Sequence, residues 1–139
     1  EQSAIVGFSF GGGVAMEIAL TRPERVNVLG LVAPVMPDRP FEPAFMENLR
    51  EVAGAIRSKG VAAAMAENWS KSPLFAHSFK KPGVQEAVAA IVADFPGAEF
   101  LATRRDEVTR DWKVPDRLSE IAIPTAVVVG ERELPGFRG

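Results

Sequence analysis

The sequence has 139 residues, 16 Lys and Arg against 18 Asp and Glu, a formal net charge of −2 and 47% hydrophobic residues. These values predict a globular domain with its own core and exclude wholesale disorder, and a charge balance without a basic tract argues against nucleic-acid binding. The chain has no cysteine and one histidine, which excludes a disulfide framework and a multi-histidine metal centre. No apolar run is long enough for a membrane span and no signal peptide is visible, so we expect a cytoplasmic protein without membrane association.

The first part of the chain predicts a strand, a glycine turn, a helix and a second strand. Residues 4–6 form a short β-rich apolar run, followed at once by a glycine-rich segment at 7–13. Residues 14–20 then follow a buried-helix pattern that stops before Pro23, and 26–33 form a second apolar run closed by proline. Together they predict one βαβ unit with a right-handed crossover and parallel strands.

The middle of the chain is predicted to be helical, and its end returns to the sheet. Prolines between residues 36 and 43 mark the departure from the sheet layer. Helical spacing then predicts helices over 45–56, 61–69 and 84–95, with a short fourth over 97–105. The last run, 125–129, is rich in β-branched residues and predicts a third strand, which Gly130-Glu131-Arg132-Glu133 follows directly.

The segment Gly7-Phe8-Ser9-Phe10-Gly11 matches the G-x-S-x-G nucleophile elbow, between a predicted strand and a predicted helix. In such a turn the serine hydroxyl projects outward, and we expect Gly7 and Gly11 to be needed because side chains there would collide across the turn. The backbone N–H of Phe10, at the start of the helix, would then face a developing oxyanion.

Two other interpretations of this glycine turn compete with the nucleophile. A phosphate-binding loop would require Gly-Lys-Ser/Thr, where this chain has Gly12-Gly13-Val14, and the glycine order also differs from a dinucleotide fingerprint. A purely structural turn would use Ser9 only to cap the helix. The nucleophile interpretation fits the spacing best.

Several segments together resemble the α/β-hydrolase superfamily. The run from Ala4 to Gly13, followed by Arg22-Pro23-Glu24-Arg25-Val26 and residues 29–34, resembles its fifth strand, elbow and sixth strand. Arg117-Leu118-Ser119-Glu120-Ile121 with Ile123-Pro124-Thr125 and residues 127–133 resembles the approach to its seventh strand. The resemblance implies a partial α/β-hydrolase fold of about three parallel strands with flanking helices, its core at 1–35 and 117–139 and a helical cap inserted at 36–116.

The same resemblance implies roles for individual residues. Ser9 would be the nucleophile, Phe10 an oxyanion-hole donor, and Glu133 the triad acid, with Glu131 as a rival that is more consistent with a structural role. Aromatic residues of the cap would either line an acyl pocket or pack the cap helices together, and the pocket candidates are Trp112, Trp69 and Phe75. The family's chemistry requires no cofactor or metal.

Parts of the family pattern have no counterpart among these residues. The first four strands, the second oxyanion donor and the catalytic histidine after an eighth strand are missing, and His77 falls in the presumed cap without matching that histidine. We therefore expect an internal segment of a larger enzyme that is inactive by itself. Its strand at residues 4–6 would be an exposed sheet edge, which we expect a second copy or a complementing segment to cover.

The sequence thus predicts a cofactor-independent serine hydrolase that acts on a small-molecule carboxylic ester, thioester or lactone. C–C hydrolase, haloperoxidase or lyase chemistry on the same scaffold stays open, because fold does not fix function. A second hypothesis is a non-catalytic relative that keeps the fold to bind a ligand or a partner.

Overall fold

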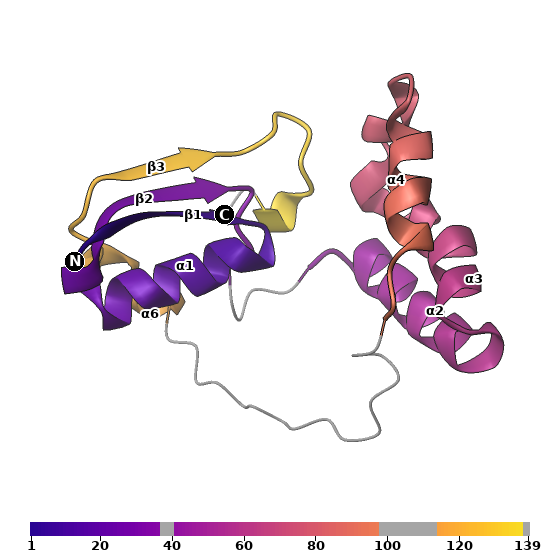
Figure 1. Cartoon of the computed structure of the whole chain (residues 1–139), viewed down its shortest axis with the longest axis horizontal. Helices are drawn as coiled ribbons and strands as arrows, with labels where there is room; N and C mark the ends of the chain where they lie inside the picture. Colours follow the sequence, from indigo (N-terminus) through magenta and orange to yellow (C-terminus); the bar gives the residue numbers. More distant parts are fainter. Residues whose placement is uncertain (37–40, 98–113, 138–139) are drawn as a thin grey trace. The chain divides into compact units, whose positions relative to one another are not determined.

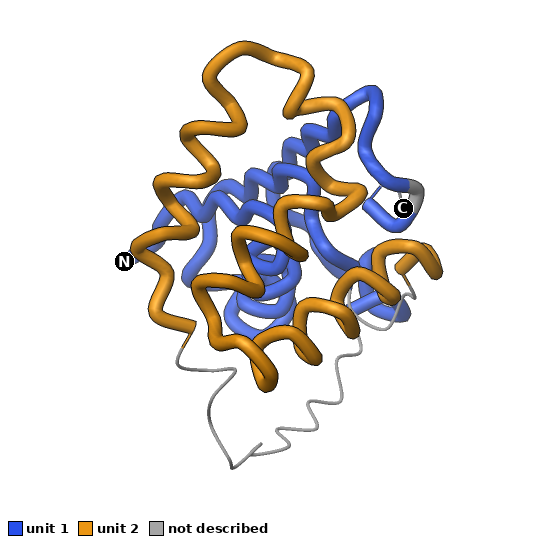
Figure 2. The backbone as a smooth tube through the Cα atoms, turned by 90° about the vertical axis from the view of Figure 1, so that its right-hand side faces the viewer, with its two compact units in different colours: residues 1–40, 109–139 blue, residues 41–108 orange. Residues whose placement is uncertain are grey.

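The chain divides into two compact units, which we describe separately (Figures 1 and 2). The computed structural model describes residues 1–36, 41–97 and 114–137. The sheet unit comprises residues 1–40 and 109–139, and the helical unit comprises residues 41–108. The helix expected over 97–105 falls almost wholly outside the described residues.

The described residues of the sheet unit form three parallel strands, as predicted. Strand β1 (Ser3–Phe8) leads into helix α1 (Phe10–Thr21), and β2 (Val26–Val32) follows after a short 3-10 turn. Strand β3 (Thr125–Val128) returns from the end of the chain to pair with β2, giving the order β1-β2-β3. Both pairs are parallel, with Gly30 opposite Val6 on one side and Ala126 on the other. This confirms the α/β fold class.

One face of this sheet carries the core of the unit. Helix α1 packs on it together with α6 (Val114–Arg117), and the fully buried side chains include Met16, Leu29 and Val114. The alternation of strand residues places Leu29 and Leu31 on this face because successive side chains point to opposite sides.

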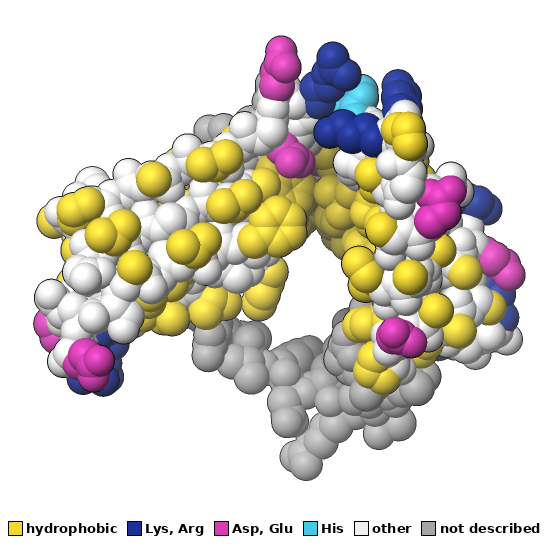
Figure 3. Space-filling view, turned by 45° about the horizontal axis from the view of Figure 1, so that its top comes forward, with side chains coloured by type: hydrophobic (Ala, Val, Ile, Leu, Met, Phe, Trp, Pro, Cys, Tyr) yellow, Lys and Arg dark blue, Asp and Glu magenta, His cyan; other side chains and the backbone are white. Residues whose placement is uncertain are grey.

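The opposite face of the sheet is apolar and exposed (Figure 3). The register places Val6, Phe8, Val28 and Val128 on this face, and the exposed fractions of Val6 and Phe8 are 74% and 69%. Parallel sheets in proteins are almost always covered on both faces. The exposed face is therefore unusual for this architecture, and β1 is also an edge strand.

The helical unit has a core of its own. Helices α2 (Pro43–Lys59), α3 (Val61–Glu67) and α4 (Val84–Ala93) match three predicted helices, although α3 ends two residues earlier than expected. The connection from α3 to α4 consists of three 3-10 turns over residues 69–71, 73–75 and 78–80. The buried side chains that join these helices come from all three of them: Val52, Ala55, Ile56, Ala64, Met65 and Val92.

Ion pairs lie at the surface of both units. Arg117 donates hydrogen bonds to Glu120, which lowers the pKa of that carboxyl below its ordinary value. Lys59 pairs with Glu67 in the same way and lowers its pKa too. Exposed pairs of this kind contribute little to stability because water and salt screen them. Among the described residues, no helix combines the length and apolar character that crossing a membrane requires.

Candidate active site

Ser9 lies at the junction of β1 and α1 in a conformation that L-residues rarely adopt. Its backbone angles are φ 52° and ψ −122°. Such a residue costs of the order of 1–3 kcal/mol and persists only where its surroundings impose it, and such residues cluster at functional sites. Ser9 occupies the N-cap position of α1, yet its side chain makes no capping hydrogen bond. The geometry therefore does not support the interpretation of Ser9 as a helix cap.

Three backbone hydrogen bonds hold Ser9 in this conformation. Its N–H donates to the carbonyl of Val32 at 3.0 Å, at the end of the neighbouring strand. Its carbonyl accepts from the N–H groups of Gly12 and Val35, both at 2.9 Å. The strained residue is thus fixed from the first turn of α1 and from the segment that leaves β2.

The segment after β2 has a second residue with positive φ, which sequence analysis did not identify. Ala33 has φ 40° and is buried, and its N–H donates to the carbonyl of Val128 in β3 at 2.8 Å. This turn directs the chain back so that Val35 reaches the carbonyl of Ser9. The positive φ of Ala33 could not be predicted from the sequence, because alanine has no preference for positive φ and the following Pro34 favours extended geometry instead.

The glycines of the turn confirm the expected collision at one of the two predicted positions. A Cβ at Gly7 would lie 2.3 Å from the carbonyl oxygen of Gly11, so only glycine fits there. A Cβ at Gly12 would lie 2.6 Å from the Cβ of Pro34. A Cβ at Gly11, by contrast, would have no atom of another segment within 4 Å. The expected collision thus occurs at Gly7 but not at Gly11, because Gly12 rather than Gly11 faces the segment after β2.

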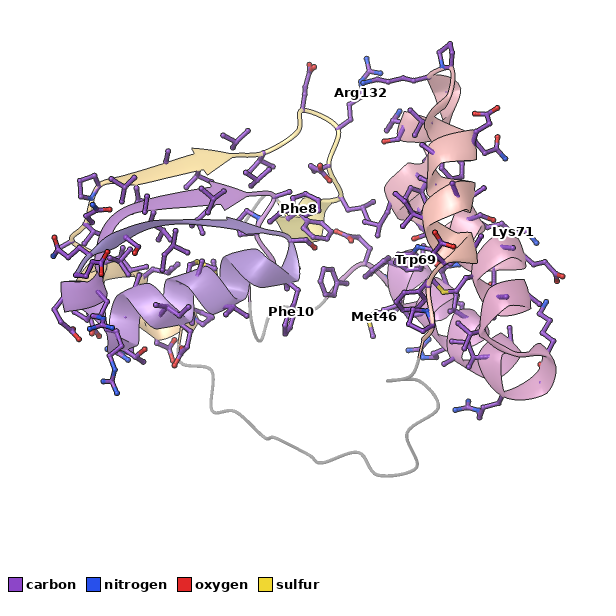
Figure 4. All side chains as sticks on the ribbon, in the orientation of Figure 1. Phe8, Phe10, Met46, Trp69, Lys71 and Arg132 are labelled. Atoms are coloured by element: carbon purple, nitrogen blue, oxygen red, sulfur yellow. The ribbon has the colours of Figure 1, made fainter. Side chains whose placement is uncertain are left out.

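Two exposed aromatic side chains flank Ser9. Phe8 ends β1 and Phe10 begins α1, and the exposed fraction of Phe10 is 67% (Figure 4). The N–H of Phe10 lies at the amino end of α1, where the helix dipole favours negative charge. An anion that forms beside Ser9 would therefore be stabilised at this end of the helix.

Glu133 lies at the same end of the sheet as Ser9, the end at which the parallel strands finish. It lies in the loop after β3, and because the strands are parallel, the segments that follow β1 and β3 leave the sheet at the same edge. The N–H of Glu133 donates to the carbonyl of Gly130 at 3.2 Å, and its half-buried side chain folds back against that glycine. Glu131 is more exposed. The topology thus brings Ser9, Phe10 and Glu133 to one edge.

The remaining candidates belong to the helical unit or lie outside the described residues. Trp69 and Phe75 pack edge to face with ring centroids 5.8 Å apart, and Phe75 stacks on Phe79 at 4.8 Å. These contacts are those of a packed cluster within the helical unit. His77 is exposed there, just before the last 3-10 turn, and Trp112 lies outside the described residues.

No group of three or more Asp, Glu or His side chains suited to a metal ion occurs in the described part of the chain.

Comparison with known proteins finds likeness at the level of structure. No protein-family model and no curated protein matches the chain. A crystal structure of the serine hydrolase CCSP0084 from the polyaromatic-hydrocarbon-degrading bacterium Cycloclasticus zankles is similar, with a TM-score of 0.54 and 21% sequence identity. The likeness covers 93% of this chain and 46% of that one, so the chain spans less than half of the similar structure. At this identity the likeness supports the fold.

Proposed function

We propose that this chain carries the nucleophile and the acid of a serine hydrolase that acts on a carboxylic ester, thioester or lactone. One observation carries the proposal: Ser9 is held at φ 52° between a strand and a helix, and its hydroxyl does not cap that helix. A turn that served only the fold could avoid this strain with glycine at the same position. The structural likeness to a protein described as a serine hydrolase adds support.

In the proposed reaction, the Ser9 oxygen attacks the carbonyl carbon of the substrate while a general base takes the hydroxyl proton. The carbonyl oxygen becomes an oxyanion beside the Phe10 N–H and the amino end of α1. Its collapse breaks the bond to the leaving alcohol or thiol, which takes up the proton from the base. Water then hydrolyses the acyl-serine ester and releases a carboxylic acid.

The general base in this proposal is a histidine outside these 139 residues. His77 is the only histidine in the sequence, and it lies in the helical unit without a residue pattern that would link it to Ser9. Glu133 would orient the incoming imidazole from the same sheet edge as Ser9. The helical unit would act as the cap. The candidates for contact with the acyl group of the substrate stay Trp69 and Phe75 of that unit and Trp112, which follows it in the sequence.

The experiment that tests the proposal is fluorophosphonate labelling of the purified chain, read by intact mass, with and without added imidazole. Imidazole replaces the missing base, so we expect slow labelling that imidazole accelerates. The variant Ser9→Ala should lose the adduct under both conditions, and His77→Ala should behave like the parent chain.

Three results would contradict parts of this proposal in different ways. Labelling that survives in Ser9→Ala would remove Ser9 as the nucleophile. Labelling that is independent of imidazole and lost in His77→Ala would make His77 the base. The absence of any adduct, even with imidazole, would favour the second hypothesis, a non-catalytic protein that uses the fold for binding.

A further inference from the structure

We infer that the helical unit contains a binding site of its own for a neutral, mainly apolar small molecule. The site is a cavity of about 300 Å³ between α3 and α4, and the described residues that line it fall between Ala62 and Ala93 of this unit. The inference depends on neither Ser9 nor the proposed hydrolase activity.

The cavity has a buried floor and an exposed rim. Met65 and Val92 lie at its floor, each with an exposed fraction of 8%, and both also belong to the core of the helical unit. Ala66 and Ala89, from the two facing helices, are exposed at the rim. Because alanine side chains are short, they leave the space between the helices unfilled. A molecule in this space would contact core side chains without displacing any of them.

The lining determines what kind of molecule would bind. None of the described residues that line the cavity is charged, so an ionic ligand would lose its hydration without gaining a counter-charge from them. The ring of Phe79 forms part of the wall and is fixed by stacking on Phe75, with 7° between the two planes. A flat apolar body therefore finds a rigid aromatic surface here.

Two polar side chains could orient such a molecule. The amide of Gln85 lies at the exposed rim and can both donate and accept a hydrogen bond. The hydroxyl of Ser70 donates to the carbonyl of Ala66 at 2.6 Å, which leaves its oxygen lone pairs as acceptors. The ligand class is thus a neutral molecule with an apolar body and one hydroxyl or carbonyl group.

The volume of the cavity sets the size of the apolar body. An apolar cavity of about 150 Å³ binds benzene, so a cavity twice as large accepts a body of about two rings or an equivalent short acyl chain. Naphthalene with one hydroxyl group, 2-naphthol, fits both this size and the polar requirement.

We propose to titrate the chain with 2-naphthol and follow the ¹³C-methyl NMR signals of alanine and methionine. Binding should be saturable and should shift Met65, Ala66 and Ala89, but not Ala15 in the core of the sheet unit. Ala89→Leu fills the cavity and should weaken binding at least tenfold. Ala90→Leu, one position along α4 and outside the lining, is the matched control and should bind like the parent chain.

A second pair of measurements keeps the inference testable if Ala89→Leu fails to fold. Gln85→Leu should weaken the binding of 2-naphthol several-fold and leave the binding of naphthalene unchanged. Ser9→Ala should bind both molecules like the parent chain, which separates this site from the proposed active site. The absence of saturable shifts in the parent chain, or equal losses in Ala89→Leu and Ala90→Leu, would overturn the inference.

Discussion

The two units differ in where they place residues with positive φ. In the described part of the helical unit these positions are all glycines, namely Gly60, Gly83 and Gly97. In the described part of the sheet unit they are Ser9 and Ala33. Glycine adopts this region at little cost, whereas a residue with a Cβ is strained there. The helical unit therefore builds its turns without strain, and the sheet unit concentrates strain beside one serine.

The strain in the described part of the sheet unit is confined to two positions, and backbone hydrogen bonds hold both of them. The N–H of Ser9 donates to Val32 in β2, and its carbonyl accepts from Val35 in the segment after β2. The N–H of Ala33 donates to Val128 in β3. Strain of this kind persists only where surrounding contacts determine the conformation. Substitutions that add a clash at the close contacts, or that relieve the strain at Ser9, should therefore affect the sheet unit differently from the helical unit.

The largest effect is expected for Gly7→Ala. Its new Cβ would meet backbone atoms of Gly11 and Gly12, which cannot move without displacing α1. We expect a loss of about 3 kcal/mol or more in the free energy of unfolding, measured by urea titration with circular dichroism. The matched control is Gly11→Ala, where the space is open, and its stability should stay equal or rise by up to about 1 kcal/mol. Equal losses in the two variants would refute the different roles of these glycines.

An intermediate effect is expected on self-association. Val6 on the exposed sheet face and Ile91 on the helical unit are similarly exposed, at 74% and 71%. If the sheet face and its β1 edge are what a second copy covers, Val6→Lys should weaken association at least tenfold, or about 1.4 kcal/mol, in sedimentation velocity.

The matched variant Ile91→Lys should associate like the parent chain, because α4 offers no unpaired backbone edge. A parent chain that stays monomeric at all concentrations would exclude self-association through the sheet. Equal weakening by both lysines would instead point to nonspecific contact between apolar surfaces.

The smallest effect is expected when the strain at Ser9 is relieved. Because glycine has no Cβ, it adopts a backbone conformation and the mirror image of that conformation with equal ease. The mirror image of φ 52° and ψ −122° is ordinary extended backbone, so glycine is not strained at position 9. The free energy of unfolding of Ser9→Gly should therefore be about 1 kcal/mol higher than that of Ser9→Ala, because alanine keeps the Cβ. Thermal and urea unfolding of the two variants measure this difference.

The control for this prediction lies in the unstrained unit. Ser58 lies within helix α2, where the variant Ser58→Gly should be less stable than Ser58→Ala by about 1 kcal/mol. This order is the opposite of that expected at position 9. If glycine were also the less stable residue at position 9, Ser9 would not be strained in solution.

The elements that sequence analysis predicted correctly are those defined by local pattern. The strand at Val26–Val32 and the helices beginning at Val61 and Val84 follow from runs of apolar or β-branched residues and the glycines that precede the helices. The need for glycine at Gly7, at the turn from β1 into α1, follows in the same way from residues close in the sequence, because a Cβ there would meet Gly11 and Gly12. In each case the deciding residues are neighbours in the sequence.

Features that depend on distant segments could not be predicted in the same way. The close approach of Pro34 to Gly12 and the positive φ of Ala33 arise only once β2 has paired with both neighbours. The steric freedom at Gly11 and the cavity beside Ala89 likewise depend on what other segments leave empty. Local sequence gives the types of residue at such places but not the atoms that they will meet.

The hydrogen bonds of Ser9 also determine when its geometry can appear during synthesis. Its partners Val32 and Val35 follow it in the sequence, so a chain still emerging from the ribosome cannot form these hydrogen bonds before residue 35 is available. The strained conformation thus depends on the parallel pairing of β1 and β2, because Val32 ends β2. If Ser9 is the nucleophile, we expect it to become reactive only after β1, α1 and β2 have assembled around it.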